Sequence, residues 1–254
     1  MPASPWPFLD HPGPLAIAHR GGAGDWPENT MPAFEHAVGL GYSYVETDAH
    51  TTADGVLVAF HDDHLDRVTD RTGAIAELAW SEVSAAVVGG TGRVPLLEDI
   101  LGAFPDVRVN IDPKADRAVE PLAEVILRTG SVDRVCIGAF SDTRLARLRE
   151  LVGARLCSSL GPRGIATLVA ASKGVPTGQL DAACAQVPVR AKGVTITTPK
   201  LVAAAHHRGM QVHVWTIDDA AEMHRLLDMG VDGIMTDRPA VLRDVLLARG
   251  EWVP

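Results

Sequence analysis

Short apolar runs rich in β-forming residues alternate with longer amphipathic segments along almost the whole chain of 254 residues. The amphipathic segments place apolar residues three and four positions apart, as in Leu145, Leu148 and Leu151, which is the spacing of one helix face. Eight β-then-α units in about 250 residues are typical of a (β/α)8 TIM barrel and fit it better than an open doubly wound sheet. The sequence therefore predicts an α/β protein with this barrel fold.

The expected strands are Leu15–His19, Tyr44–His50, Val107–Ile111, Val135–Phe140, Arg155–Leu160, Ala182–Val189, Gln211–Thr216 and Gly233–Thr236. The expected helices are Met31–Leu40, Leu96–Phe104, Val119–Thr129, Thr143–Leu151, Ile165–Ser172, Lys200–His207, Ala220–Met229 and Ala240–Arg249. The sixth strand is the least distinct of the eight, because Gly193–Thr197 competes with Ala182–Val189 for that place.

One stretch after the second strand, about residues 51–95, interrupts the alternation. It carries an extra strand, Val56–His61, followed by polar sequence that contains glycine. We interpret it as a small insertion on the barrel rim. Since no long repeat or Ser/Pro-rich linker divides the chain, residues 1–254 are predicted to form a single domain.

The charge balance limits the partners of this protein. Its 23 basic and 32 acidic residues give a net charge of −9. Affinity for a phosphate backbone comes from clustered Lys and Arg, so this balance argues against a general nucleic-acid or anionic-membrane binder. It does not exclude a small phosphorylated substrate held by a metal ion and one or two bases.

Other features point to the cytoplasm. Cys136, Cys157 and Cys184 lack CxxC spacing and are interpreted as buried free thiols in a reducing compartment. The N-terminal residues 1–14 show no basic region followed by an apolar one, so no signal peptide is recognised. Apolar runs such as Ile165–Ala171 are much shorter than the roughly 20 residues of a spanning helix, so no stable membrane insertion is expected. Nothing in the sequence indicates an oligomeric state.

Acidic residues occur at the ends of two expected strands where barrel enzymes place their active sites. Glu46 and Asp48 are two residues apart, so both side chains point to one face of an extended strand, and Asp112 follows the same pattern on the next barrel strand. Three converging carboxylates repel one another unless a cation lies between them, and oxygen ligands favour Mg²⁺ or Ca²⁺. The alternative is that they are solvated acids or salt-bridge partners.

His19 and His61 are the candidate acid–base pair. Imidazole titrates near neutral pH, so one ring can accept a proton while the other donates one. Arg20 follows His19 and can hold a phosphate through two parallel hydrogen bonds, while Asp62 follows His61. The alternative for an isolated histidine at a strand end is a structural hydrogen bond.

Two glycine-rich stretches and two acidic residues are further candidates for ligand contacts. Gly21–Gly24 lacks the order of a dinucleotide fingerprint, and Gly89–Gly92 lacks the Lys-Ser/Thr of a P-loop, so neither indicates a nucleotide. Asp232 and Asp237 flank the expected eighth strand, and whether either contacts a ligand stays open.

Residues 18–73 resemble the glycerophosphodiester phosphodiesterase family through its HRG…PENT, ExD…TxDG, HD and RxT elements, in order and with matching spacing. Later blocks of that family are similar to four further stretches, VPLLEDIL (94–101), VNIDPK (109–114), VHVWTID (212–218) and GVDGIMTD (230–237). The resemblance spans nearly the whole chain. It implies a TIM barrel that hydrolyses phosphodiesters with one divalent cation.

The resemblance also implies roles for individual residues. His19 and His61 match the two catalytic histidines, and Glu46 and Asp48 match the first two metal ligands. The remaining site positions are the phosphate-binding Arg20, the supporting Lys114, the aromatic pocket wall Trp215, and Glu28 of PENT, whose role is unassigned.

Two positions depart from the family pattern. The third metal ligand is usually glutamate, whereas Asp112 is one methylene shorter, which changes the reach of the ligand. The related sphingomyelinase D-type enzymes have aspartate there. The family's WTxN ends here in Asp218, which puts a carboxylate near the rim and casts doubt on a substrate contact through that asparagine.

The predicted reaction is metal-assisted hydrolysis of a glycerophosphodiester to sn-glycerol 3-phosphate and an alcohol such as choline or ethanolamine. His61 is favoured as the acid and His19 as the base, with the order left open by the sequence.

Two alternatives remain. One is phospholipase D-like cleavage of lysophospholipids, which needs an exposed apolar rim that Leu78, Trp80 and Val83 of the insertion would supply unless they pack it against the barrel. The other is a non-catalytic phosphoester-binding barrel.

Overall fold

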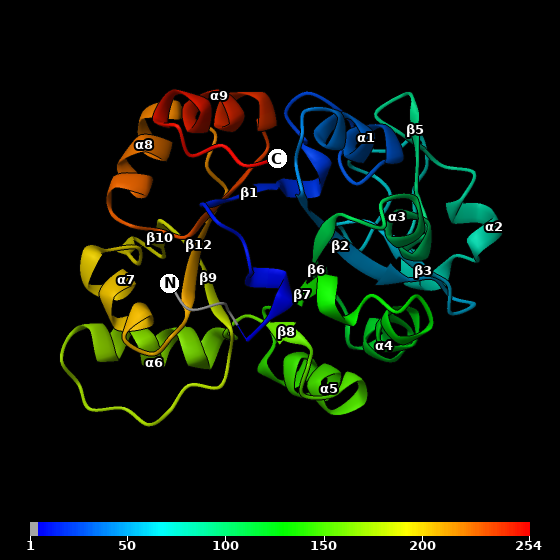
Figure 1. Cartoon of the computed structure of the whole chain (residues 1–254). Coiled ribbons are helices and arrows are strands. Elements are labelled where there is room, and N and C mark those ends of the chain that lie inside the picture. The colour runs from blue at the N-terminus through cyan, green and yellow to red at the C-terminus, as the bar shows by residue number, and fades with distance from the viewer. Residues whose placement is uncertain (1–4) are drawn as a thin grey trace.

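Eight parallel strands form a nearly closed barrel, as the sequence predicts (Figure 1). The computed structural model describes residues 5–254; residues 1–4, which begin the segment without a recognised signal peptide, lie outside the described residues. The barrel strands are β1 (Leu15–Ala18), β2 (Tyr44–Thr51), β6 (Arg108–Pro113), β7 (Val135–Ile137), β8 (Cys157–Ser158), β9 (Cys184–Pro188), β12 (Gln211–Trp215) and β13 (Gly233–Thr236). They pair in the order β8-β7-β6-β2-β1-β13-β12-β9.

The two end strands of this order approach each other and bring the barrel close to closure. A parallel bridge joins Ser159 to Cys184, and the backbone N–H of Leu160 donates to the carbonyl oxygen of Cys184 at 2.9 Å. The strand expected at Arg155–Leu160 is longer than β8. Its other residues lie on either side of β8 and are not part of a strand.

Eight helices surround the barrel and follow the predicted segments within a few residues. They are α1 (Met31–Gly39), α3 (Leu97–Ala103), α4 (Val119–Arg128), α5 (Asp142–Val152), α6 (Pro162–Ser172), α7 (Pro199–His206), α8 (Ala220–Asp228) and α9 (Pro239–Arg249). Proline begins three of them, where its missing N–H costs no hydrogen bond. Gly250, in the left-handed region at φ 69°, ends α9.

The segment that competed for the sixth strand lies outside the barrel. β10 (Arg190–Ala191) and β11 (Val194–Thr195) form a separate antiparallel hairpin between β9 and α7. The assignment of Ala182–Val189 to the sixth barrel strand is therefore confirmed by β9.

The interruption after β2 lies at the rim. β3 (Leu57–Ala59) pairs antiparallel with the end of β2, and α2 (Trp80–Val83), β4 (Val87–Val88) and β5 (Gly92–Arg93) follow it. Val83 is fully buried, and Leu78 and Trp80 pack against the insertion's own apolar cluster, so these side chains pack the insertion and do not form an apolar rim. The division of the chain into one domain with an insertion stays a prediction.

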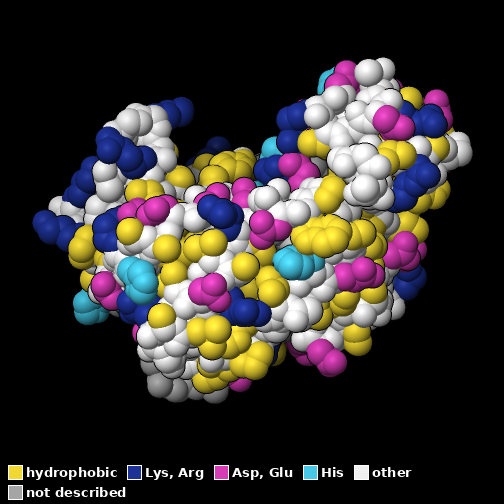
Figure 2. Space-filling model, turned by 90° about the horizontal axis from the view of Figure 1, so that it is seen from above, with side chains coloured by type: hydrophobic (Ala, Val, Ile, Leu, Met, Phe, Trp, Pro, Cys, Tyr) yellow, Lys and Arg dark blue, Asp and Glu magenta, His cyan; other side chains and the backbone are white. Residues whose placement is uncertain are grey.

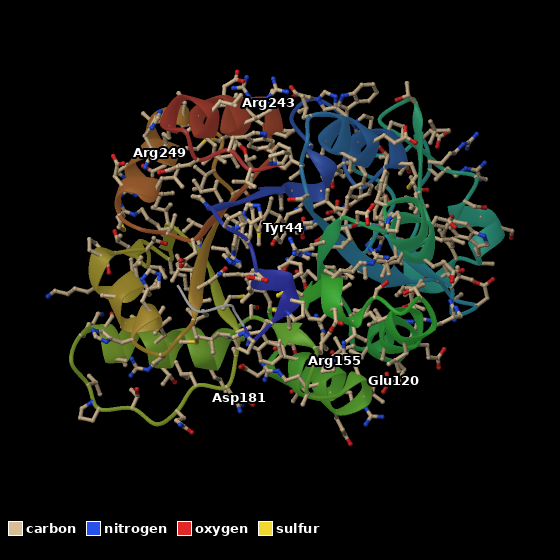
Figure 3. All side chains as sticks on the ribbon, viewed as in Figure 1. Tyr44, Glu120, Arg155, Asp181, Arg243 and Arg249 are labelled. Atoms are coloured by element: carbon tan, nitrogen blue, oxygen red, sulfur yellow. The ribbon has the colours of Figure 1, made fainter. Side chains whose placement is uncertain are left out.

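The barrel interior is closed at the N-terminal ends of its strands by a short 3-10 helix, η1 (Pro7–Leu9). Phe8 is fully buried, and its ring packs edge-on against Tyr44 with centroids 5.3 Å apart. The Tyr44 hydroxyl, in the middle of the barrel in Figure 3, donates to the carbonyl oxygen of Phe8 at 2.8 Å. The other short 3-10 helices are η2 (His19–Gly21), η3 (Ile75–Glu77), η4 (Asp116–Ala118) and η5 (Val132–Arg134).

Two sequence predictions about location can be compared with the structure. The three cysteines are free and buried. No helix within residues 5–254 is both long and apolar enough to cross a membrane.

Truncation of the side chain that closes the barrel is expected to destabilise the fold. Phe8→Ala should lower the free energy of unfolding by about 3–5 kcal/mol, because it leaves a cavity where a fully buried ring stood. Urea unfolding followed by circular dichroism measures the change. Leu247→Ala, at a side chain 52% exposed on α9, is the control and should stay within about 0.5 kcal/mol of the parent. Equal effects of the two substitutions would contradict this role of Phe8.

Candidate active site

The predicted acids face the inside of the barrel at the C-terminal ends of β2 and β6. In the parallel register, Glu46 lies opposite Asn110 and Asp48 lies opposite Asp112. All four residues are buried. The alternation of side chains along each strand thus brings Glu46, Asp48 and Asp112 to one end of the barrel, which we call the mouth.

His19 follows β1 in the short helix η2, where the chain turns sharply. Arg20 has a left-handed backbone, with φ 51°, and its N–H donates to Oε2 of Glu46 at 2.9 Å. The His19 ring donates from Nδ1 to Oδ1 of Asp237 at 2.7 Å, and its Nε2 lies 3.8 Å from Oε2 of Glu46. Burial lowers the pKa of His19, but Glu46 and Asp237 outweigh this effect and leave the pKa raised.

His61 follows β3 and has a carboxylate partner of its own. Its Nδ1 donates to Oδ1 of Asp62 at 2.6 Å. Asp62 in turn accepts from Nε of Arg67 at 2.5 Å, and this bond is the main reason that its pKa falls to about 2. Both histidines therefore have Nδ1 bound to an acid, which leaves Nε2 as the ring atom available for chemistry.

Burial and like charge act strongly on Glu46. Its pKa rises to about 7, first because the carboxyl is fully buried and second because Asp48 is close. For Asp48 burial acts in the same direction, but Lys114 and Arg20 outweigh it, so its pKa is lowered. Burial raises the pKa of Asp112 despite Lys114. Burial thus disfavours the charged forms of Glu46 and Asp112, whereas the neighbouring bases keep Asp48 charged.

Two bases share these acids. Nζ of Lys114 lies 2.7 Å from Oδ1 of Asp48 and 2.7 Å from Oδ2 of Asp112. Nε of Arg20 lies 3.3 Å from Oδ2 of Asp48 but is buried without a hydrogen-bond partner, and its Nη1 donates to Oε1 of Glu28 at 3.1 Å. Arg20 thus has hydrogen-bonding capacity left for an anion.

The donor chemistry fits a hard divalent cation. Glu46, Asp48 and Asp112 supply only oxygen ligands, and burial and the nearby Asp48 raise the pKa of Glu46, so a cation beside this carboxyl would favour its charged form. As the side chains lie, no three His, Cys, Asp or Glu of the described chain form a metal-ligating group, and the Lys114 ammonium lies between two of the acids. The metal-binding role of the three carboxylates stays a prediction.

Two further predicted residues lie at the mouth. Glu28 connects the two sides of it, because it accepts from Arg20 and, through Oε1 and Oε2, from Arg67 at 2.6 and 2.9 Å. Trp215 ends β12 half-buried and packs edge-on against the exposed ring of Phe140, with centroids 5.6 Å apart. The roles of all the predicted site residues stay predictions.

The Asp218 carboxylate accepts two hydrogen bonds from within the protein. Its Oδ1 accepts from the hydroxyl of Thr236 at 2.9 Å and from the backbone N–H of Asp237 at 2.8 Å. These are bonds that an asparagine oxygen could also accept. Asp218 therefore helps to place Asp237, which holds His19.

The sequence left open whether Asp237 contacts a ligand, and it did not indicate Asn29 or Arg67 as individual site residues. Asn29, next to Glu28 in the chain, donates from Nδ2 to Oδ2 of Asp48 at 2.9 Å. Asp237 directly follows the last strand, and barrel active sites lie at the C-terminal ends of the strands. This position was the sequence signal for Asp237. Asp232, at the other end of that strand, binds the backbone N–H of Val212 instead.

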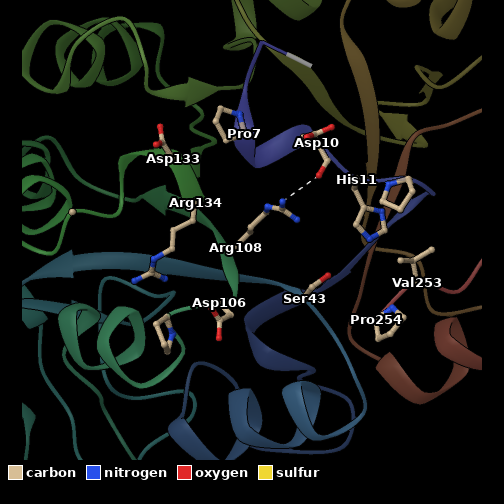
Figure 4. A pocket seen from close by; sticks show the side chains of 13 residues that line it. Pro7, Asp10, His11, Ser43, Asp106, Arg108, Asp133, Arg134, Val253 and Pro254 are labelled. Atoms are coloured by element: carbon tan, nitrogen blue, oxygen red, sulfur yellow. Dashed lines mark hydrogen bonds between the residues drawn. The ribbon is translucent and has the colours of Figure 1, made fainter. Parts of the chain in front are cut away.

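A separate concavity of about 550 Å³ lies at the N-terminal end of the barrel (Figure 4). Arg108 reaches into it and donates to the Tyr44 hydroxyl at 3.0 Å and to the Asp10 carbonyl oxygen at 3.1 Å. None of the predicted site residues lines this concavity. The acid–base chemistry therefore belongs to the mouth.

Comparisons with known proteins agree with this geometry. Residues 19–241 match the model of the glycerophosphoryl diester phosphodiesterase family. The probable glycerophosphodiester phosphodiesterase 2 of Mycobacterium tuberculosis is 45% identical, with 96% of this chain and 95% of the relative covered. A lysophospholipase D of Homo sapiens is 30% identical, with 91% and 85% covered.

A solved structure shows the same fold. It is that of an Oleispira antarctica phosphodiesterase in complex with the product sn-glycerol 3-phosphate. The two chains superpose with a TM-score of 0.78 at 22% identity, with 92% of this chain and 97% of the other covered.

Removal of the acid behind His19 is expected to lower the pKa of that ring. Asp237→Asn keeps the shape of the side chain but removes the charge that favours the protonated imidazole. An NMR titration of the His19 ring carbons measures the change. Asp232→Asn, at the opposite end of the same strand, should leave the His19 titration unchanged. An unaltered His19 pKa in Asp237→Asn would contradict the assigned pairing.

Proposed function

The chain belongs to the glycerophosphoryl diester phosphodiesterase family, and from that premise we propose that it is a metal-dependent enzyme that hydrolyses glycerophosphodiesters to sn-glycerol 3-phosphate and an alcohol. The name of the 45% identical relative and the product bound to the Oleispira antarctica phosphodiesterase support the substrate class.

One observation carries the proposed chemistry: two histidines at one mouth are each oriented by a carboxylate. His19 donates to Asp237 and His61 to Asp62, both from Nδ1. A carboxylate at Nδ1 fixes the ring and stabilises the imidazolium that forms during proton transfer. A protein that only binds a phosphoester has no need of two rings held in this way, which speaks against the non-catalytic alternative.

The phosphate is proposed to lie against Arg20 and Lys114. Arg20 has a buried Nε without a hydrogen-bond partner, and Lys114 can turn from Asp48 and Asp112 toward a phosphate oxygen. Glu46, Asp48 and Asp112 would hold Mg²⁺ or Ca²⁺, which when bound polarises a phosphate oxygen and offsets negative charge. Glu28 would keep Arg20 in place, and the face of Trp215 would bound the organic part of the substrate.

His19 is proposed as the general base and His61 as the general acid. The negative charges of Glu46 and Asp237 raise the pKa of the His19 ring, which suits proton removal from water or from the substrate's own adjacent hydroxyl. His61 has the more accessible side chain, 32% exposed against 14% for His19, which suits protonation of an alcohol that departs toward solvent.

Cleavage of lysophospholipids is the second candidate. Its support is the relative named as a lysophospholipase D and the aspartate at position 112, where the family usually has glutamate. Phe140, 70% exposed, supplies apolar surface at the mouth, whereas the insertion does not. A turnover panel of glycerophosphodiesters and lysophospholipids separates the two candidates.

For location, the cytoplasm is our proposal, supported by three free buried thiols.

The two histidines are expected to differ in their dependence on the leaving group. His19→Ala and His61→Ala should each lower turnover of glycerophosphocholine by about 10²–10⁴-fold. With a p-nitrophenyl ester of glycerol phosphate, whose leaving group needs no protonation, His61→Ala should recover most activity and His19→Ala should not. His206→Ala, at a surface ring bound to Asp232, is the matched control and should keep full turnover. Recovery in His19→Ala alone would reverse the assignment, and full activity of both variants would contradict the mechanism.

Chelation is expected to abolish turnover. Treatment with EDTA should lower the rate on the order of 100-fold or more, with recovery on addition of Mg²⁺ or Ca²⁺. The melting temperature gives an independent readout, because an ion bound only by the folded state stabilises it. Asp48→Asn should lose the rise in melting temperature with the ion, while Asp244→Asn on the surface of α9 keeps it. Turnover that survives chelation would contradict the proposed cation.

A further inference from the structure

The β10–β11 hairpin, residues 190–195, stands at the mouth of the barrel. At its base, the carbonyl oxygen of Val189 accepts from the N–H of Ile196 at 2.9 Å. Pro188, two residues before the hairpin, is the strand partner of Trp215. The hairpin therefore rises beside the aromatic side chain that borders the proposed substrate site.

The hairpin is short and well defined by its sequence. Arg190 pairs with Thr195 and Ala191 with Val194, which leaves Lys192 and Gly193 as a two-residue turn. Both turn residues have positive φ, 48° and 81°, the pattern of a type I′ turn that matches the twist of a hairpin. The Arg190 guanidinium donates to the carbonyl oxygen of Gly193 at 3.0 Å. This geometry fixes a lysine at the tip, with all six residues exposed.

The segment that carries the hairpin is basic, whereas the protein as a whole is acidic. The net charge is −9, yet no Asp or Glu occurs from Ala182 to Ile217. Arg190 and Lys192 in the hairpin and Lys200 at the start of α7 are all exposed. Figure 2 shows the result: the upper edge is hollowed between two projecting lobes, and Lys and Arg gather on the left-hand lobe, on the side of β10 and α7 in Figure 1.

Exposed apolar side chains accompany these bases. Val194 is 54% exposed in the hairpin itself. Phe140 is 70% exposed and packs edge-on against Trp215, whose strand partner Pro188 leads into the hairpin. Bases and solvent-exposed apolar groups thus share one rim of the mouth.

We propose that this rim is an interaction surface for anionic phospholipid membranes, with the hairpin as its main contact. The bases would lie among lipid phosphates, and Val194 and Phe140 would contact the apolar boundary beneath them. Contact through this rim would turn the mouth toward the lipid surface. It requires neither a spanning helix nor deep insertion.

The acidic net charge does not prevent such contact. Charges more than about 8 Å from the surface are largely screened at physiological ionic strength, so the bases that touch the lipid decide the attraction. Membranes fit better than nucleic acids, because a sequence-independent nucleic-acid site needs a longer basic track and has no use for an exposed Val and Phe beside it.

Sedimentation of the full chain with vesicles tests this surface without any turnover. Vesicles of phosphatidylcholine with 30% phosphatidylglycerol should bind the protein, whereas pure phosphatidylcholine vesicles should bind far less, and 1 M NaCl should release it. Arg190→Gln/Lys192→Gln should bind roughly 25-fold more weakly, since each base near an anionic surface contributes about five-fold. Because both side chains are exposed, the melting temperature should not change.

The matched control is Lys173→Gln/Arg208→Gln. It makes the same change of charge at exposed residues that follow α6 and α7, at the opposite end of the barrel, and should bind as the parent does. Absence of preference for phosphatidylglycerol, equal losses in the two double variants, or tighter binding to a single-stranded oligonucleotide than to the vesicles would overturn the proposal. Because no step of the assay requires catalysis, these outcomes are independent of the proposed hydrolysis.

Discussion

The concentration of buried carboxylates at one end of the barrel is the constraint on which the rest of the site depends. Glu46, Asp48 and Asp112 are placed there by strand alternation and register, with the bases Lys114 and Arg20 as their partners. Burial and the nearby Asp48 raise the pKa of Glu46 to about 7, so a cation beside this carboxyl would favour its charged form. An arrangement this costly to fold is understandable if it serves to bind a metal ion and a phosphate.

Much of the fold was predictable because its signals are local. Strands and helices show in periodicity, and Pro239 and Gly250 bound α9 as their backbone preferences require. Strand-end carboxylates and histidines could be grouped because a parallel barrel brings the ends of its strands together. The expected strand Gly233–Thr236 matches β13, so the position of Asp237 at the mouth end of this strand was predictable, whereas its bond to His19 was not.

The contacts that could not be predicted join residues far apart in the chain. The bond from His19 to Asp237 spans 218 positions, and Arg67 reaches Glu28 across 39. Gly193–Thr197 competed with Ala182–Val189 for the sixth strand, and the pairing of β9 with β12 decides between them. The two departures from the family pattern also have partners far apart in the chain or on another strand. Asp218 accepts a hydrogen bond from the backbone N–H of Asp237 and so positions it, and Asp112 and Asp48 both contact Lys114.

The central claim is that this mouth hydrolyses a glycerophosphodiester on the alcohol side of the phosphate. Phosphorus-31 NMR of glycerophosphocholine incubated with the protein and a divalent cation tests it most directly, because the possible products have separate resonances. We expect the diester signal to be replaced by that of sn-glycerol 3-phosphate, with choline released. Accumulation of phosphocholine, or a diester signal that persists with Mg²⁺ and with Ca²⁺, would contradict it.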